Sequence, residues 1–150
     1  MSVSFDLDDT LILRHEPAAG FEPRSRFAAA VLFAEERLRL GTRRLHRHLK
    51  AQGHEFWIYT SSLRSAGFIR RCFLSHSIWA DGIVNDDRHR QALQRSRTPG
   101  QPCKFPPAFG IGLHIDDSPG VAQLGLNLGF RVLQVDPADE DWADKVLAAL

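Results

Sequence analysis

Short apolar runs recur along the chain, and polar or acidic residues follow most of them. Five runs have the length and the β-branched or aromatic content of buried strands; they cover 3–7, 56–59, 82–84, 111–115 and 130–135. The longest purely apolar run, 27–34, has eight residues, whereas a membrane span needs about 20. The pattern therefore predicts a globular chain with no membrane-spanning segment.

Helical spacing appears between these runs. The predicted helices cover 42–52, 64–76, 119–128 and 141–150, and a further helix begins within 27–40. Leu45 and Leu49, for example, lie four residues apart among Arg, His and Lys, and Pro119 suits the first position of a helix. The segment 11–26 contains two prolines and a glycine and is predicted to be a loop or flap. The segment 86–110 is polar and basic, and we assign it no element.

Strands that alternate with helices are typical of a parallel sheet covered on both faces, and such sheets bind ligands at the carboxyl ends of their strands. Three predicted strands end in acids or hydroxyls: Asp6 and Asp8, Thr60 and Ser61, and Asp116 and Asp117. A length of 150 residues predicts one α/β domain over 1–150, large enough to bury its own core.

Aspartates follow both the first and the fourth predicted strand, so they converge at one edge if these strands are neighbours. Clustered carboxylates repel one another, and their charge calls for a cation. A site that offers only oxygen atoms suits Mg²⁺, which typically binds one or two carboxylates together with a phosphate. A strand-end hydroxyl and a lysine would bind that phosphate, and a carboxylate can serve as its acceptor. The residues alone therefore favour Mg²⁺-assisted phosphoryl transfer.

Four motifs in the chain resemble those of the haloacid dehalogenase-like (HAD) phosphohydrolases, in the same order. Phe-Asp-Leu-Asp-Asp-Thr-Leu over 5–11 resembles the first motif, and Ile-Tyr-Thr-Ser-Ser over 58–62 resembles the second. Lys104, the only lysine between the second and fourth motifs, stands in the place of the third. His-Ile-Asp-Asp-Ser-Pro over 114–119 resembles the fourth, acidic motif.

The resemblance implies a role for each matched residue. Asp6 would be the nucleophile, and Asp8 would be the general acid for the leaving group and then the base that activates water. Mg²⁺ would be held by the Asp6 carboxylate, the Asp8 backbone carbonyl and Asp116. Thr60, Ser61 and Lys104 would bind the phosphoryl oxygens, and Asp117 would orient either Lys104 or a metal-bound water.

The resemblance also implies a fold, a HAD-like Rossmannoid three-layer sandwich whose five-stranded parallel sheet has strand one at its centre. Only 51 residues separate Asp8 from Thr60, and 19 separate Val84 from Lys104, so neither gap can hold a substantial cap domain. The site should therefore be open, which favours a large or macromolecular phosphorylated substrate.

Three strings also resemble the subgroup that dephosphorylates the C-terminal domain of RNA polymerase: Leu-Asp-Asp-Thr-Leu, Tyr-Thr-Ser-Ser-Leu and Ile-Asp-Asp-Ser-Pro. The chain departs from that subgroup in its fourth motif, where Asp117 stands in place of the usual asparagine.

Composition leaves two alternatives open. Net charge is +1, which provides no strong field for nucleic acid, but sixteen of the nineteen basic residues are arginine. One basic cluster lies within 37–50, and a second comprises Arg88, Arg90, Arg95 and Arg97. Each is interpreted as a solvated face or as a patch for nucleic acid or an acidic partner. A non-catalytic module that binds nucleic acid or protein and a nucleic-acid-end phosphatase therefore remain alternatives to a Mg²⁺-dependent phosphomonoester hydrolase that acts through Asp6.

Two cysteines without metal-ligand spacing, and acids where a secretory signal would be apolar, predict a cytoplasmic protein. The sequence does not predict an oligomeric state.

Overall fold

A computed structural model of the chain describes residues 1–17, 19–96 and 100–150. Its centre is a five-stranded sheet in which every pairing is parallel, in the order β3-β2-β1-β4-β5. The strands are β1 (Ser2–Phe5), β2 (Glu55–Tyr59), β3 (Gly82–Val84), β4 (Ile111–Asp116) and β5 (Val132–Gln134). The sheet confirms the predicted α/β class and the central position of the first strand.

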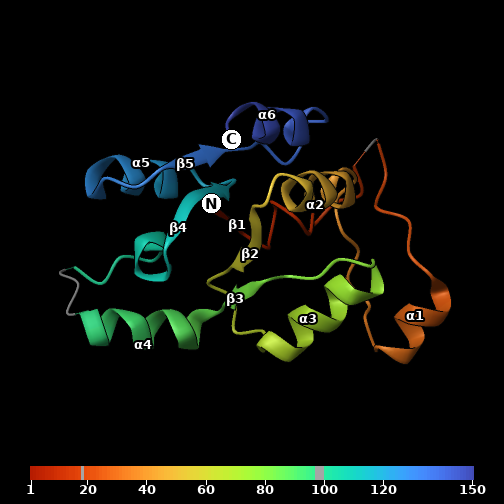
Figure 1. The fold of residues 1–150 in the computed structure, drawn as a ribbon. Helices are drawn as coiled ribbons and strands as arrows, with labels where there is room; N and C mark the ends of the chain where they lie inside the picture. Colours follow the sequence, from red (N-terminus) through yellow and green to blue (C-terminus); the bar gives the residue numbers. More distant parts are fainter. Residues whose placement is uncertain (18, 97–99) are drawn as a thin grey trace.

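Helices cover both faces of this sheet, which gives three layers (Figure 1). They are α1 (Arg26–Val31), α2 (Thr42–Ala51), α3 (Ala66–Ser75), α4 (Asp86–Ser96), α5 (Pro119–Leu128) and α6 (Trp142–Ala148), together with a 3₁₀ turn, η1 (Pro106–Phe109). Right-handed crossovers place α2 and α3 on one face and α4 and α5 on the other, because the strand order reverses after β3. Helix α6 packs beside α2.

The central strand is buried because its neighbours and both helical layers enclose it. Val3 and Phe5 are fully buried, and the Phe5 ring stacks on Phe56 of β2 with centroids 4.8 Å apart. In register, Phe5 lies opposite Ile58 on one side and Ile115 on the other. The opposite face of β1 carries Ser4, which is also fully buried, so both faces of the strand are covered, as in parallel sheets, and the pairing fixes where β1 ends relative to β4.

Helix α4 lies in the polar segment to which the sequence assigned no element. Asp86 and Asp87 occupy its first turn, where carboxylates are favoured, and Arg90 pairs with Asp86 at 2.8 Å. Its buried positions include the polar His89 as well as Leu93, so the helix has no continuous apolar stripe. The helical periodicity of hydrophobic residues in the sequence is therefore weak. Residues 97–99, including Arg97 of the second basic cluster, lie outside the described residues.

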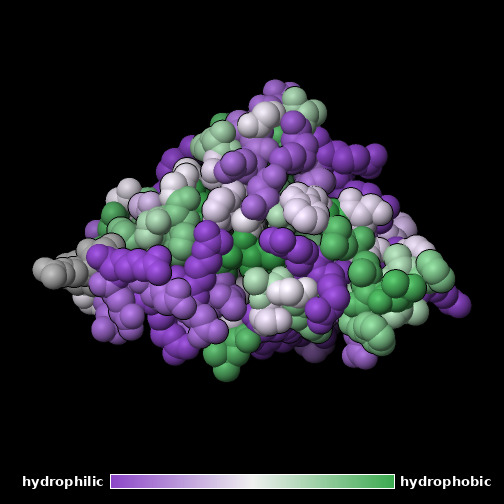
Figure 2. Space-filling view, turned by 60° about the horizontal axis from the view of Figure 1, so that its bottom comes forward, coloured by the Kyte–Doolittle hydropathy of each residue, from purple (hydrophilic) through white to green (hydrophobic). Residues whose placement is uncertain are grey.

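The helix predicted to begin within 27–40 is short. Helix α1 ends at Val31, and the chain reverses through Phe33, whose φ is 50°. Three apolar side chains of this region are exposed: Phe27, Val31 and Phe33. Figure 2 shows apolar surface gathered over α1, at the right of the view. Between β1 and β2 the chain forms a loop, α1 and α2, so no large cap domain is inserted there.

In the described parts of the chain, every helix is too short or too polar to cross a bilayer.

Two glycines of α5 should respond to alanine in opposite directions. A Cβ on Gly125 would lie 2.7 Å from Val132 Cγ2 and 2.8 Å from the Phe130 carbonyl oxygen, whereas the nearest atom at Gly120 is 3.4 Å away. We expect Gly125→Ala to destabilise the fold by about 1–3 kcal/mol, because the helix cannot move off β5 without losing packing. Gly120→Ala should be neutral or stabilising by up to about 1 kcal/mol. Urea unfolding of both variants checks this, and a neutral Gly125→Ala would contradict it.

Candidate active site

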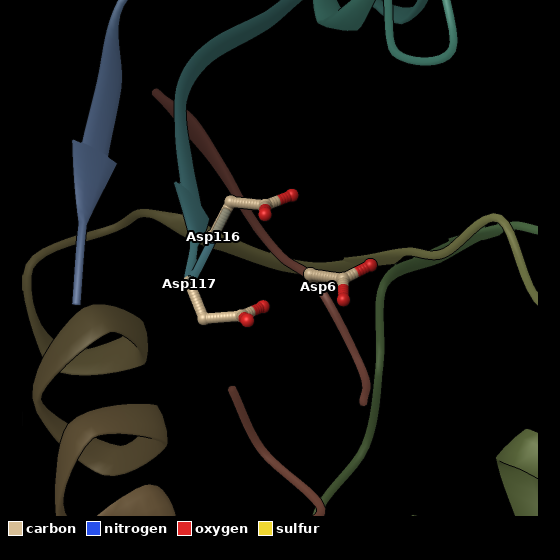
Figure 3. Close-up of side chains that lie close together, drawn as sticks. All are labelled: Asp6, Asp116 and Asp117. Carbon is tan, nitrogen blue, oxygen red and sulfur yellow. The ribbon is translucent and has the colours of Figure 1, made fainter. Parts of the chain in front are cut away.

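Three carboxylates meet at the carboxyl edge of the sheet. Asp6 follows β1, and its N–H donates to the Ile115 carbonyl at 2.8 Å, which ties it to β4. Asp116 ends β4, and Asp117 follows it directly. One oxygen from each of the three carboxylates lies within 4.8 Å of the others, and the side chains approach one another in Figure 3. The first and fourth strands are thus neighbours, as the expected convergence of their aspartates required.

A buried ammonium group lies against these acids. Lys104 Nζ is 2.5 Å from Asp6 Oδ1 and 3.8 Å from Asp116 Oδ2, and it also donates to the Tyr59 carbonyl at 2.5 Å. Only 3% of the side chain is exposed. A lysine this buried keeps its charge only beside anions, so the carboxylates and Lys104 stabilise each other's ionised forms.

Burial and charge set the pKa values of these acids apart. Burial raises the pKa of Asp6 to about 6; the Lys104 ammonium opposes this rise, and the Asp116 charge adds to it. Burial would also raise the pKa of Asp116, but the hydrogen bond from His114 and the Lys104 charge lower it below its ordinary value. Burial and the Asp116 charge raise the pKa of Asp117. Asp116 is therefore the acid of the group that stays ionised to the lowest pH.

His114 fixes the Asp116 carboxylate. The imidazole is fully buried, and burial lowers its pKa, so the ring is neutral. Its Nε2 lies 3.0 Å from Asp116 Oδ2 and its Nδ1 lies 2.8 Å from Ser4 Oγ. With the proton on Nε2, the ring donates to Asp116 and accepts from the Ser4 hydroxyl. His114 was not among the predicted site residues, although its place two residues before Asp116 puts both side chains on one face of β4.

A second buried chain of hydrogen bonds braces Lys104. The Phe105 N–H donates to Tyr59 Oη at 2.8 Å, Tyr59 Oη lies 2.6 Å from His89 Nδ1, and His89 Nε2 lies 2.8 Å from the Pro102 carbonyl. A neutral His89 protonated on Nε2 satisfies every one of these bonds, and burial lowers its pKa. The backbone is thus anchored on both sides of Lys104, at Pro102 and at Phe105. No sequence pattern pointed to His89, because it lies in the segment given no element.

Asp8 is directed toward a different partner. Arg64 Nη1 lies 2.9 Å from both Asp8 carboxylate oxygens and 3.1 Å from Ser62 Oγ, and its Nη2 lies 3.0 Å from Glu36 Oε1. These contacts join the loop after β1 to the turn after β2. Arg64 was also missed, since a single arginine in a turn carries no pattern.

The turn after β2 supplies the expected hydroxyls. Thr60 is buried, and its Oγ1 accepts the Ser62 N–H at 3.0 Å, so the threonine shapes the turn. Ser61 is exposed beside it. The structure brings every sequence-predicted site residue to one cavity of about 460 Å³, whose lining includes Asp6, Asp8, Thr60, Ser61, Lys104, Asp116 and Asp117.

No family model matches the chain, and no curated protein matches it. Solved structures do. A chain of the Pnkp1/Rnl/Hen1 complex superposes with a TM-score of 0.55 at 19% identity over 92% of this chain, and a chain of the Pnkp1/Rnl/Hen1 RNA repair complex does so with 0.52 at 18% over 89%. This chain spans only 46% and 42% of those two chains.

A third structure, a predicted HAD-like family hydrolase from Porphyromonas gingivalis, has a TM-score of 0.50 at 11% identity. The superposition covers 99% of this chain and 97% of that one. The chain has the HAD-like fold. The fold expected from the four motifs is therefore confirmed. At these identities the likeness establishes the fold alone.

The charge balance of the site predicts a pKa that can be measured directly. In protein freed of divalent cations, we expect the Asp6 carboxyl ¹³C signal to titrate near pH 6, and that of Asp116 to titrate below the ordinary range of an aspartate. Because the folded pKa of Asp6 lies above its ordinary value, this group's contribution to stability is present at low pH and is lost as pH rises through about 6.

Lys104→Met should move the Asp6 midpoint upward, since the ammonium that favours the carboxylate is gone. Lys145→Met, which removes an exposed lysine outside this cavity, is the matched control and should leave the midpoint unchanged. An Asp6 midpoint near 4 in the unaltered protein would contradict the described burial.

Proposed function

We propose that the protein is a Mg²⁺-dependent phosphomonoester hydrolase that works through an aspartyl-phosphate on Asp6. The contact between Asp6 and the buried Lys104 ammonium carries this proposal, because it sets a carboxylate and a phosphate-binding cation side by side at the edge of a parallel sheet. The four motifs and the fold support it. Residues 1–150 would form a single HAD-like domain.

The acidic group suits a hard divalent cation. Its three side chains offer oxygen ligands alone, and one ammonium beside three carboxylates leaves the group negatively charged. Asp6, Asp116 and the Asp8 backbone carbonyl would hold Mg²⁺, with Asp117 as a ligand or as the acceptor for a bound water. When bound, the ion would neutralise charge on the phosphoryl oxygens.

The side chains have complementary places in the first step. A carboxylate oxygen of Asp6 would attack phosphorus while the bond from phosphorus to the leaving oxygen breaks, and protonated Asp8 would give that oxygen its proton. Lys104, Thr60 and Ser61 would hold the phosphoryl oxygens, which stabilises the charge that develops on them. The hydrogen bonds of Tyr59 to Lys104 and Phe105 would keep the ammonium in position to bind the phosphoryl group.

The second step returns the enzyme to its starting state. Asp8, now a carboxylate, would take a proton from water as the water oxygen attacks phosphorus, which releases phosphate and the Asp6 carboxylate. Arg64 donates to both Asp8 oxygens at 2.9 Å and would orient the carboxylate that this step needs; Asp8 has to part from Arg64 to carry its proton in the first step.

Replacement of the nucleophile is the direct test. With an aryl phosphate and Mg²⁺, we expect Asp6→Asn to lower kcat at least about 10³-fold, since an amide cannot form the acyl phosphate. Asp87→Asn, which alters an exposed acid of α4, serves as the control and should be unaffected. Chelation of the metal should abolish turnover, and added Mg²⁺ should restore it. Normal turnover by Asp6→Asn would reject the mechanism.

A nucleic-acid-end phosphatase is the second candidate, because two of the similar structures come from Pnkp1/Rnl/Hen1 complexes, one of them described as an RNA repair complex. The purely binding alternative has less support. Within the basic cluster at 37–50, Arg39 and Arg43 donate to backbone carbonyls, and Arg44 and Lys50 pair with carboxylates. Arg39 in particular is buried rather than on a solvated face, so this cluster offers few unengaged cations for a polyanion.

Substrate comparison separates the candidates. An oligonucleotide with a 3′- or 5′-phosphate, a phosphopeptide and a sugar phosphate should be compared at equal concentration for release of phosphate. If the second candidate is right, kcat/KM for one oligonucleotide end exceeds the other values and falls steeply with added salt. Equal or lower rates on both oligonucleotides would exclude it.

We also propose a cytoplasmic location. Cys72 and Cys103 are both free thiols, one buried and one exposed, which suits a reducing compartment.

A further inference from the structure

A second cavity of about 560 Å³ adjoins the cavity that holds the acids. Three segments form its walls: the loop after β1, the turn before α2, and the segment that leads into α6. Asp9 and Arg14 line both cavities. Their side chains form an ion pair, with Arg14 Nε 2.9 Å from Asp9 Oδ2, so this pair marks the boundary between the two spaces.

Arg39 ties the walls of this second cavity together. Only 3% of the residue is exposed. Its guanidinium donates to the carbonyls of Thr10, Asp136 and Asp139 at 3.4, 2.8 and 2.5 Å, and it lies 4.7 Å from the centre of the Trp142 ring. Trp142 in turn donates to the Leu40 carbonyl at 2.9 Å. This buried cation ties its own turn to two loops, the one after β1 and the one before α6, and so holds the cavity in a defined shape.

The lining is largely apolar. The apolar lining residues include Leu13, Pro17, Leu40, Pro137, Ala138 and Ala143. Each arginine in the described lining already has an acceptor: Arg14 pairs with Asp9, Arg44 with Asp144, and Arg39 with the carbonyls. Glu16 and Glu140 add negative charge. Apart from His15, the described lining therefore has no basic side chain left unpaired for a second anionic group, and the space suits an uncharged apolar body.

Building on the proposed phosphatase activity, we infer that this cavity binds the leaving group of the phosphomonoester and that this group is an uncharged ring system. With the phosphoryl group against Lys104 and Thr60, an ester substituent that passes the Asp9–Arg14 pair enters the apolar space. A cavity of this size can enclose such a group. A rigid ring fills it with less loss of conformational freedom than a flexible chain does.

Filling the cavity tests the inference. Ala138 is exposed at its wall, so Ala138→Trp should occupy the space without touching the acids. For 2-naphthyl phosphate we expect kcat/KM to fall at least tenfold, mainly through KM, while acetyl phosphate, which carries no ring, stays within twofold. Ala108→Trp on η1 is the matched control and should change neither rate. An equal loss on both substrates, or no loss on either, would overturn the inference.

Binding of the ring alone provides a readout that needs no catalysis. We expect 2-naphthol, without phosphate or metal, to shift the methyl signals of Leu13 and Leu40, and Ala138→Trp to abolish these shifts. If naphthol shifts these signals but no phosphate ester is hydrolysed, the ring site stands and the phosphatase proposal fails. If esters are hydrolysed but the signals do not move, the ring site is rejected and the phosphatase proposal stands.

Discussion

The site depends on one electrostatic constraint: a lysine ammonium buried among carboxylates at the edge of a parallel sheet. Lys104 can remain charged at 3% exposure only because Asp6 and Asp116 lie against it. Asp6, in turn, stays ionised near neutral pH only because Lys104 offsets part of the cost of its burial. Each group would be costly alone, and together they leave a residual negative charge for a divalent cation to balance.

The fold supplies the geometry that this constraint needs. Because β1 pairs in parallel with both β2 and β4, their carboxyl ends bring Asp6, the Thr60 turn and Asp116 to one place. Two neutral histidines then hold the charged groups still. His114 bonds to Asp116, and His89 anchors the segment that carries Lys104. The chain thus uses buried imidazoles as fixed donors and acceptors, with burial keeping them uncharged.

The sequence predicted those parts of the structure that repeat or follow directly from strand order. The alternation of strands and helices gave the sheet, and acids after the first and fourth strands gave the convergence of Asp6 with Asp116. The residues that brace the site could not be predicted in this way. His89, His114 and Arg64 act through single tertiary hydrogen bonds that leave no period in the sequence. Arg39 was expected on a solvated face, but its three carbonyl acceptors come from loops whose meeting depends on the whole fold.

The proposed chemistry requires that the carboxylates of Asp6 and Asp116 bind a divalent cation beside Lys104. Anomalous scattering from crystals soaked in Mn²⁺, a cation that accepts the same oxygen ligands as Mg²⁺, tests it most directly. We expect a peak between the side chains at the ends of β1 and β4, and we expect Asp116→Asn to remove it. A peak elsewhere, or none at this edge of the sheet in a well-occupied crystal, would contradict it.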